Sequence, residues 1–130
     1  MKISMRLEKA AVKKFLQELK EILTWEDFSI DRNLLIVKSR KERAQYSTPF
    51  TLVGLGYDTH DIVDRLRELS IEEYSETLVD RDNSEPPLLF VFGKEIKGRQ
   101  VYIKLKVKAK RRSLCLSFHY AEYRMEHPYQ

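Results

Sequence analysis

Residues 88–119 constrain the fold of this chain most, because two turn signals divide them into three runs of alternating apolar and polar residues. The turn signals are Lys97-Gly98 and the neighbourhood of Lys110-Arg111. Alternation with a period of two is typical of β-strands that bury one face. We therefore expect an antiparallel β-meander, with strands near residues 88–95, 99–108 and 113–120.

The chain before the meander is expected to be mostly helical. Apolar residues recur at helical spacing from Leu7 to Leu23, and a second helical pattern follows Asp58. A short strand is expected at Leu34 to Val37. Helices followed by an antiparallel meander predict an α+β fold with the N-terminal helices packed on one face of the sheet. We divide one domain of 130 residues into a helical part (about 6–75), an exposed acidic loop (about 76–87), the meander (about 88–120) and a tail (121–130).

Positive charge is concentrated in the meander. Residues 94–112 contain nine Lys or Arg residues and one Glu, a local charge of +8 in a chain whose formal net charge is +4. Such a local excess indicates an anionic partner at one surface. Nucleic acid is the first candidate. A membrane is not expected as a partner, because the basic stretch has the pattern of strands rather than of an amphipathic helix.

Several other classes of protein are disfavoured. The chain has a single cysteine, Cys115, so an internal disulfide is excluded. It lacks both an apolar stretch of about 20 residues and an apolar signal core, and we expect a cytoplasmic protein. No glycine-rich phosphate loop, HExxH motif or carboxylate cluster with metal-ligand spacing is present, so neither a cofactor nor a metal is expected.

Alternation in the last two strands predicts which side chains share a face. In the middle strand, even-numbered residues from 102 to 108 lie opposite the apolar row. In the last strand, Leu116 and Phe118 are expected toward the core. Cys115 and His119 would then share the polar face with the lysines.

The turn between these strands sets their register. A two-residue loop at 110–111 and a four-residue loop at 109–112 give the same pairing. The pairs that both loops predict are Tyr102 with His119, Lys104 with Ser117, and Leu105 with Leu116. Directly opposed side chains have Cβ atoms about 5 Å apart. A tyrosine, a histidine and a lysine are therefore predicted to converge on one small anion.

This combination suits RNA cleavage without a metal, which needs a base for the 2′-hydroxyl, an acid for the leaving oxygen and cations for the phosphate. His119 and Tyr102 are predicted to share acid and base duty, with neighbouring lysines lowering the pKa of the tyrosine. Lys104 would stabilise charge on the phosphate. Further RNA contacts are predicted at Lys94, Arg99, Lys106, Arg112 and Tyr123.

A second interpretation stays open. Antiparallel strands with an exposed face ordinarily carry lysine and tyrosine there, without any catalytic role. The basic sheet face could therefore belong to a non-catalytic module that binds RNA or a regulatory protein.

Two stretches of the chain resemble the MqsR family of toxins, which are mRNA interferases of toxin-antitoxin modules with a RelE-like fold. The similar segments are GLGYDTHDIVDRLRELSIEEY and the stretch from VFGKEIKGRQVYIKLKV through SFHYAEYRMEHPY, together about half of the chain. The resemblance implies endonucleolytic cleavage of mRNA by 2′-hydroxyl attack, with no required metal. It also implies a cognate antitoxin that binds zinc and carries a DNA-binding segment. Whether cleavage requires a ribosome is left open.

The resemblance also assigns residues. The family's strand tyrosine and its neighbouring lysine fall on Tyr102 and Lys104, and the functional position of the last strand, a lysine in the best-known members, falls on His119. Two further family positions differ here: a lysine falls on or beside Glu76, and a glutamine falls near Val91.

Overall fold

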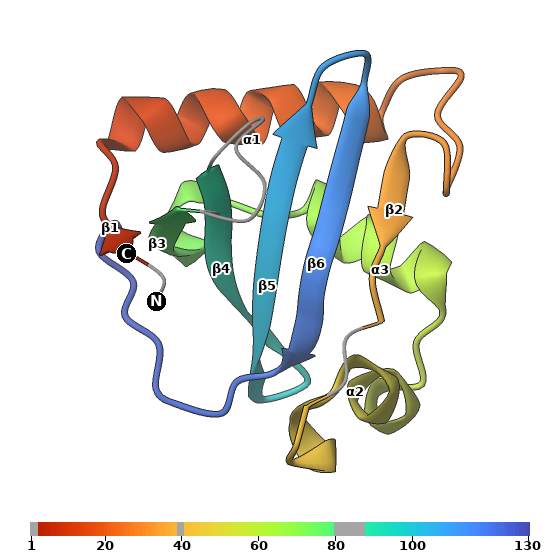
Figure 1. Cartoon of the computed structure of the whole chain (residues 1–130), viewed down its shortest axis with the longest axis vertical. Helices are drawn as coiled ribbons and strands as arrows, with labels where there is room; N and C mark the ends of the chain where they lie inside the picture. The colour runs from red at the N-terminus through yellow and green to blue at the C-terminus, as the bar shows by residue number, and fades with distance from the viewer. Residues whose placement is uncertain (1–2, 39–40, 80–87) are drawn as a thin grey trace.

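The computed structural model of this chain describes residues 3–38, 41–79 and 88–130. The strands within these ranges form one six-stranded sheet in the order β1-β3-β4-β5-β6-β2 (Figure 1). The strands are β1 (Ser4–Met5), β2 (Leu34–Ile36), β3 (Tyr74–Val79), β4 (Leu88–Ile96), β5 (Arg99–Lys108) and β6 (Arg112–Tyr120). The helices are α1 (Lys9–Leu23), α2 (Thr48–Leu55) and α3 (Thr59–Arg67), with 3-10 turns η1 (Ala44–Tyr46) and η2 (Ile71–Glu73).

The predicted α+β class and the three-stranded meander are confirmed. β4, β5 and β6 are antiparallel neighbours at the centre of the sheet, and β4 and β5 are joined by a two-residue turn at Lys97 and Gly98. Both turn residues have left-handed backbones, with φ of 51° and 81°, as a tight hairpin requires. The sheet is larger than expected, because β3 and β1 extend it beyond β4 and β2 pairs in parallel with β6.

The predicted exposed loop at 76–87 is wrong for its first residues. Residues 76–79 belong to β3 and pair with β4, Glu76 lying opposite Val91. Acidic composition suggested a loop, but the backbone hydrogen bonds to β4 and the burial of Leu78 decide the conformation. Residues 80–87 lie outside the described part of the chain.

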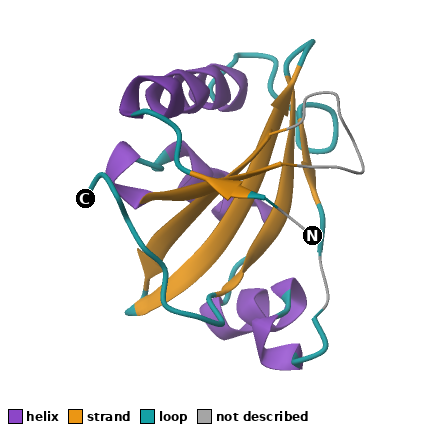
Figure 2. Ribbon diagram, turned by 60° about the vertical axis from the view of Figure 1, so that its left-hand side comes forward, coloured by secondary structure: helices purple, strands orange, loops and turns teal. Residues whose placement is uncertain are grey.

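Two helices cover one face of the sheet (Figure 2). The ring of Phe15 on α1 stacks on Phe90 of β4 with centroids 3.9 Å apart, and Ile62 and Leu66 of α3 join the same core. The remaining helix, α2, packs at the end of the same core, to which it contributes Leu52 and Leu55. It sits beyond the end of β6, where the backbone N–H of Tyr120 donates to Thr51 Oγ1.

The register between β5 and β6 changes along the hairpin. Near the predicted site Tyr102 pairs with His119, as expected. Beyond Lys104 the register shifts by one residue, because the connection is a three-residue loop at 109–111 and Leu116 forms a bulge. The predicted two- or four-residue turn is therefore wrong, and so is the pairing predicted for Leu105, whose partner is Cys115.

The bulge reverses the faces of the residues next to it. Cys115 is fully buried in the main core, on the opposite face from the one predicted. Leu116 lies on the other face, beside Tyr102 and Val91. Lys106 is 1% exposed, so the predicted solvent-facing row of lysines is interrupted.

Candidate active site

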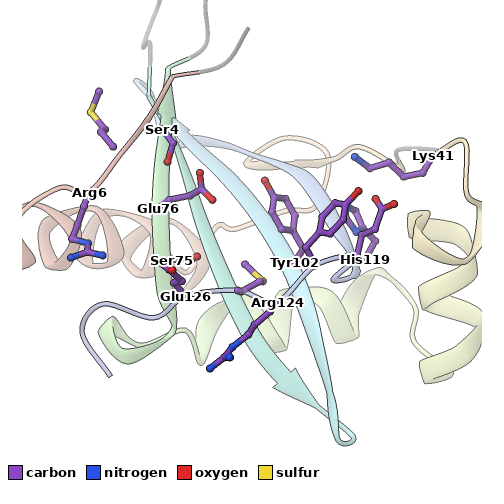
Figure 3. A pocket seen from close by; sticks show the side chains of 13 residues that line it. Ser4, Arg6, Lys41, Ser75, Glu76, Tyr102, His119, Arg124 and Glu126 are labelled. Atoms are coloured by element: carbon purple, nitrogen blue, oxygen red, sulfur yellow. The ribbon is translucent and has the colours of Figure 1, made fainter.

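A cavity of about 700 Å³ lies against the sheet face that α1 and α3 leave free (Figure 3). Four strands, the C-terminal tail and the segment before η1 contribute to its walls. The residues that line it are Ser4, Met5, Arg6, Lys41, Ser75, Glu76, Tyr102, His119, Glu122, Tyr123, Arg124, Met125 and Glu126.

Tyr102 and His119 form the back of this cavity. They are cross-strand partners whose rings stack with centroids 5.1 Å apart and planes 11° apart. On its other side Tyr102 pairs with Gly93 of β4. A Cβ at Gly93 would lie 2.8 Å from both His127 Nε2 and Met125 Sδ, so the glycine lets the tail lie directly on the sheet.

The hydrogen bond of His119 determines its tautomer. Its Nδ1 lies 2.9 Å from the carbonyl oxygen of Tyr120, which can only accept, so Nδ1 carries the proton. Burial lowers the pKa of His119, the bond to Tyr120 opposes this, and the charges of Lys41 and Lys104 lower it further. The ring is therefore neutral near pH 7, and Nε2 holds a lone pair. That atom is buried and has no hydrogen-bond partner within residues 3–38, 41–79 and 88–130.

Tyr102 behaves differently from the expectation. Burial, and secondarily the charge of Glu76, raises its pKa to about 12. The prediction that nearby lysines lower this pKa is wrong, because desolvation of the phenol and the negative charge of Glu76 both raise it. Tyr102 therefore stays protonated at physiological pH and can donate a hydrogen bond but cannot serve as a base.

The cations around the cavity are not the predicted ones. Lys41 reaches toward the Tyr102–His119 pair from the segment before η1, while Arg6 and Arg124 lie on the other side (Figure 3). An ion pair of 3.7 Å between Arg43 and Glu122 links the segment of Lys41 to the tail. The sequence contained the basic run at 38–43, but no periodicity placed it beside His119.

The cavity is not a basic surface. Its lining contains three cationic side chains and an equal number of carboxylates, which are those of Glu76, Glu122 and Glu126. The strong positive charge counted along the meander is therefore distributed elsewhere on the protein.

Three predicted RNA contacts lie outside the cavity and are engaged in the fold. Lys94 points to the helical side of the sheet, where its Nζ lies 3.1 Å from Glu73 Oε2. Lys106 is buried. The guanidinium of Arg99 stacks on the ring of Tyr120 at 3.6 Å from its centroid.

The other predicted residues are more accessible. Tyr123 is 77% exposed at the rim of the cavity, and Arg112 is exposed at the far end of the hairpin. Lys104 is half-buried, two residues along β5 from Tyr102 and opposite Ser117 as predicted.

In the described part of the chain, no group of three or more His, Cys, Asp or Glu side chains could hold a metal ion. No helix there has the length and hydrophobicity needed to cross a bilayer. Comparison of the chain with protein-family models, curated proteins and solved structures gave no match.

Proposed function

We propose that the protein is a metal-independent endoribonuclease that cleaves mRNA by attack of a 2′-hydroxyl, as the toxin of a type II toxin-antitoxin module. The observation that carries the proposal is the stacked Tyr102–His119 pair at the wall of a cavity, with an unprotonated and unpartnered Nε2 on His119. The resemblance to the MqsR family and a central meander with helices on one face support a RelE-like arrangement.

The groups present are sufficient for the reaction. His119 Nε2 takes the proton of the 2′-hydroxyl while the 2′-oxygen forms a bond to phosphorus. The bond from phosphorus to the 5′-oxygen breaks, and that oxygen receives the proton of the Tyr102 hydroxyl. Proton transfer from imidazolium through solvent restores the tyrosine. The products are a 2′,3′-cyclic phosphate and a 5′-hydroxyl.

Cations in the cavity would stabilise the negative charge that develops on the phosphate. Lys41 reaches toward the pair and is best placed for this role, while Arg6 and Arg124 lie on the other side of the cavity (Figure 3). Lys41 replaces the predicted Lys94, which is bound to Glu73 on the opposite face. The positive charge of Lys104 contributes indirectly, because it lowers the pKa of His119 and so favours the neutral ring.

Access to the base requires movement. Nε2 of His119 is shielded from solvent, so a ribose hydroxyl reaches it only after side chains at the cavity wall shift. Catalytic hydrogen bonds commonly tighten only when the substrate is bound.

The partners proposed for the protein follow from the same resemblance. They are mRNA and a cognate, zinc-binding antitoxin with a DNA-binding segment, both met in the cytoplasm. Neither a membrane nor a cofactor is part of the proposal.

The test uses purified full-length protein and a single-stranded RNA in excess EDTA. The wild type should generate fragments ending in 2′,3′-cyclic phosphate, and His119→Ala should generate none. The matched control is His60→Ala, because His60 is exposed on α3 and away from the cavity. If the wild type leaves RNA intact both with and without ribosomes, the proposal is wrong.

A non-catalytic RNA-binding module is the second candidate, and the shielding of Nε2 is the observation that favours it. In that case RNA would bind in a salt-dependent manner and remain intact. Binding would then survive both His119→Ala and Tyr102→Phe.

A further inference from the structure

The positive charge that the cavity lacks is concentrated at the end of the β5–β6 hairpin. Four of its five residues are cationic, and we call Lys108, Lys110, Arg111 and Arg112 the basic hairpin end. None of the four forms an ion pair with the residues that the structure describes. Their charges are therefore available to an external anion.

The arrangement of these cations opposes stability at two points. Lys108 and Arg112 are directly opposed cross-strand partners, and like charges in such a pair repel each other. Lys110 and Arg111 have left-handed backbones, with φ of 61° and 52°. Glycine or asparagine is the favoured residue at such positions.

Strain and repulsion at one site indicate that the residues are kept for something other than the fold. The turn would be more stable with uncharged, smaller residues. Two of the four cations have a structural role: Arg111 stacks over Trp25 at 4.5 Å, and Arg112 Nε donates to the carbonyl oxygen of Ala109 at 3.3 Å. The fold does not explain the other two, Lys108 and Lys110.

The basic hairpin end is held in place from the side. Asn33, in the turn before β2, donates from Nδ2 to the carbonyl oxygen of Arg111 at 3.0 Å. The carbonyl oxygen of Asn33 accepts from Ser113 Oγ at 2.7 Å. These bonds hold the backbone of the loop, so little backbone entropy is lost when the loop binds a ligand.

Lys108 lies on the same sheet face as Tyr102, because both are even-numbered residues of β5 without an intervening bulge in that strand. Six residues along a strand span about 20 Å. The basic hairpin end therefore lies on the same side of the sheet as the cavity, although buried Lys106 separates the two. An RNA chain long enough to pass over this covered stretch would reach both.

We propose that the basic hairpin end is a second RNA-binding site, which holds the phosphodiester backbone outside the cavity without reading its sequence. This inference rests on the proposed function, since RNA is the substrate class that the cavity chemistry fits. RNA is favoured over a compact anion because its charges repeat along a chain. The cavity, with equal numbers of cations and carboxylates, positions the reacting phosphate, and the hairpin end supplies affinity.

The decisive variant is Lys108→Gln/Lys110→Gly, which removes two charges together with the repulsion and the strained lysine. Its urea midpoint should equal or exceed that of the wild type. Its affinity for a 20-nucleotide single-stranded RNA should fall at least fivefold at low salt. The slope of log K against log salt should become shallower by about 1.4, since each phosphate contact with a single strand contributes roughly 0.7.

The matched control is Lys13→Gln/Lys14→Gln, which removes two exposed lysines from α1 on the other side of the sheet. Its RNA affinity should stay within about twofold of the wild type. Its salt slope should differ from that of the wild type by less than about 0.3. If the hairpin variant binds RNA as tightly as this control does, the proposal is wrong. The proposal is also wrong if the hairpin variant keeps its RNA affinity but loses binding to an acidic protein.

Cleavage separates this proposal from the proposed function. A trinucleotide is too short to span both sites, so the hairpin variant should cleave it at the wild-type rate while cleaving the 20-nucleotide RNA more slowly at low concentration. His119→Ala should show the reverse pattern, with RNA affinity kept and cleavage lost. If the wild type cleaves no RNA, the binding measurement alone still decides whether the hairpin end is an RNA site.

Discussion

Tyr102 and His119 face each other across β5 and β6 with their rings stacked 5.1 Å apart, and the hydrogen bond from His119 Nδ1 to the Tyr120 carbonyl directs the free lone pair to Nε2. Burial keeps the histidine neutral and the tyrosine protonated near pH 7. The two side chains are therefore in the protonation states that a base and an acid need before substrate arrives.

The rate of RNA cleavage should depend on the neutral form of His119. Burial lowers the pKa of this histidine below its ordinary value of 6.5. The rate should therefore be constant near pH 7 and fall as the pH drops, with an inflection below 6.5. A pH–rate profile measured with saturating RNA checks this. An inflection above pH 7 would contradict the assigned state of the base.

The same pKa shift should make stability depend on pH. As the pH falls below about 6.5, the unfolded chain binds a proton on His119 that the native protein does not, so the free energy of unfolding decreases. This contribution is fully present above pH 6.5 and is lost toward lower pH. Urea unfolding at pH 7.5 and 5.5 should show a smaller decrease for His119→Gln than for the wild type. Equal decreases would argue against burial as the cause of the shift.

Tyr102→Phe should distinguish the contribution of the Tyr102 hydroxyl from that of its ring. The ring stack on His119 remains, so the free energy of unfolding should change by at most about 1.5 kcal/mol, the usual net value of a hydrogen bond. Cleavage should fall by about 10²–10⁴, the contribution of one general acid. Because burial raises the pKa of Tyr102 to about 12, the wild type should keep its activity up to pH 10. The matched control is Tyr57→Phe, whose hydroxyl contacts Arg65, and it should cleave RNA at the wild-type rate.

Cys115 provides a direct test of the bulge at Leu116. In the structure the thiol is fully buried, and burial raises its pKa to about 12. A thiol reagent at pH 8 should therefore leave the native protein unlabelled and modify one thiol per chain in 8 M urea. Rapid labelling of the native protein would instead place Cys115 on the cavity face, as uninterrupted alternation predicted.

The pairing of Tyr102 with His119 was predictable, although the path of the hairpin was not. A three-residue loop shifts the register by one residue, and the bulge at Leu116 shifts it back before Ser117. Two deviations that alternation cannot reveal therefore cancel at the site. For the residues between the loop and the bulge the predicted register is wrong, and Cys115 lies in the core instead of on the polar face.

The rest of the cavity could not be predicted from periodicity. Lys41 and Arg124 lie in segments without regular secondary structure, whose positions depend on contacts such as the ion pair from Arg43 to Glu122. Glu76 was assigned to a loop because its neighbours are acidic, but pairing with β4 places it in a strand near Tyr102. The charge count along the meander predicted a basic surface, but a count cannot show that one of its lysines, Lys106, is buried.

Gly93→Ala should displace the C-terminal tail from the sheet. The added Cβ would lie 2.7 Å from Gln100 Oε1 and 2.8 Å from both His127 Nε2 and Met125 Sδ, so several side chains must move together. Overpacking of this kind costs about 1–3 kcal/mol. Urea unfolding should show this loss, and trypsin should cut the native variant after Arg124 faster than it cuts the wild type.

The control for this substitution is Gly98→Ala. Gly98 has φ of +81° and no atom within 4 Å of an added Cβ, so alanine there strains the turn without touching the tail. Gly98→Ala should lose stability while the cleavage rate after Arg124 under native conditions stays near that of the wild type. Because Arg124 and Met125 also line the cavity, only Gly93→Ala should reduce RNA cleavage. If trypsin cuts both variants at the same rate, the tail does not depend on the missing side chain of Gly93.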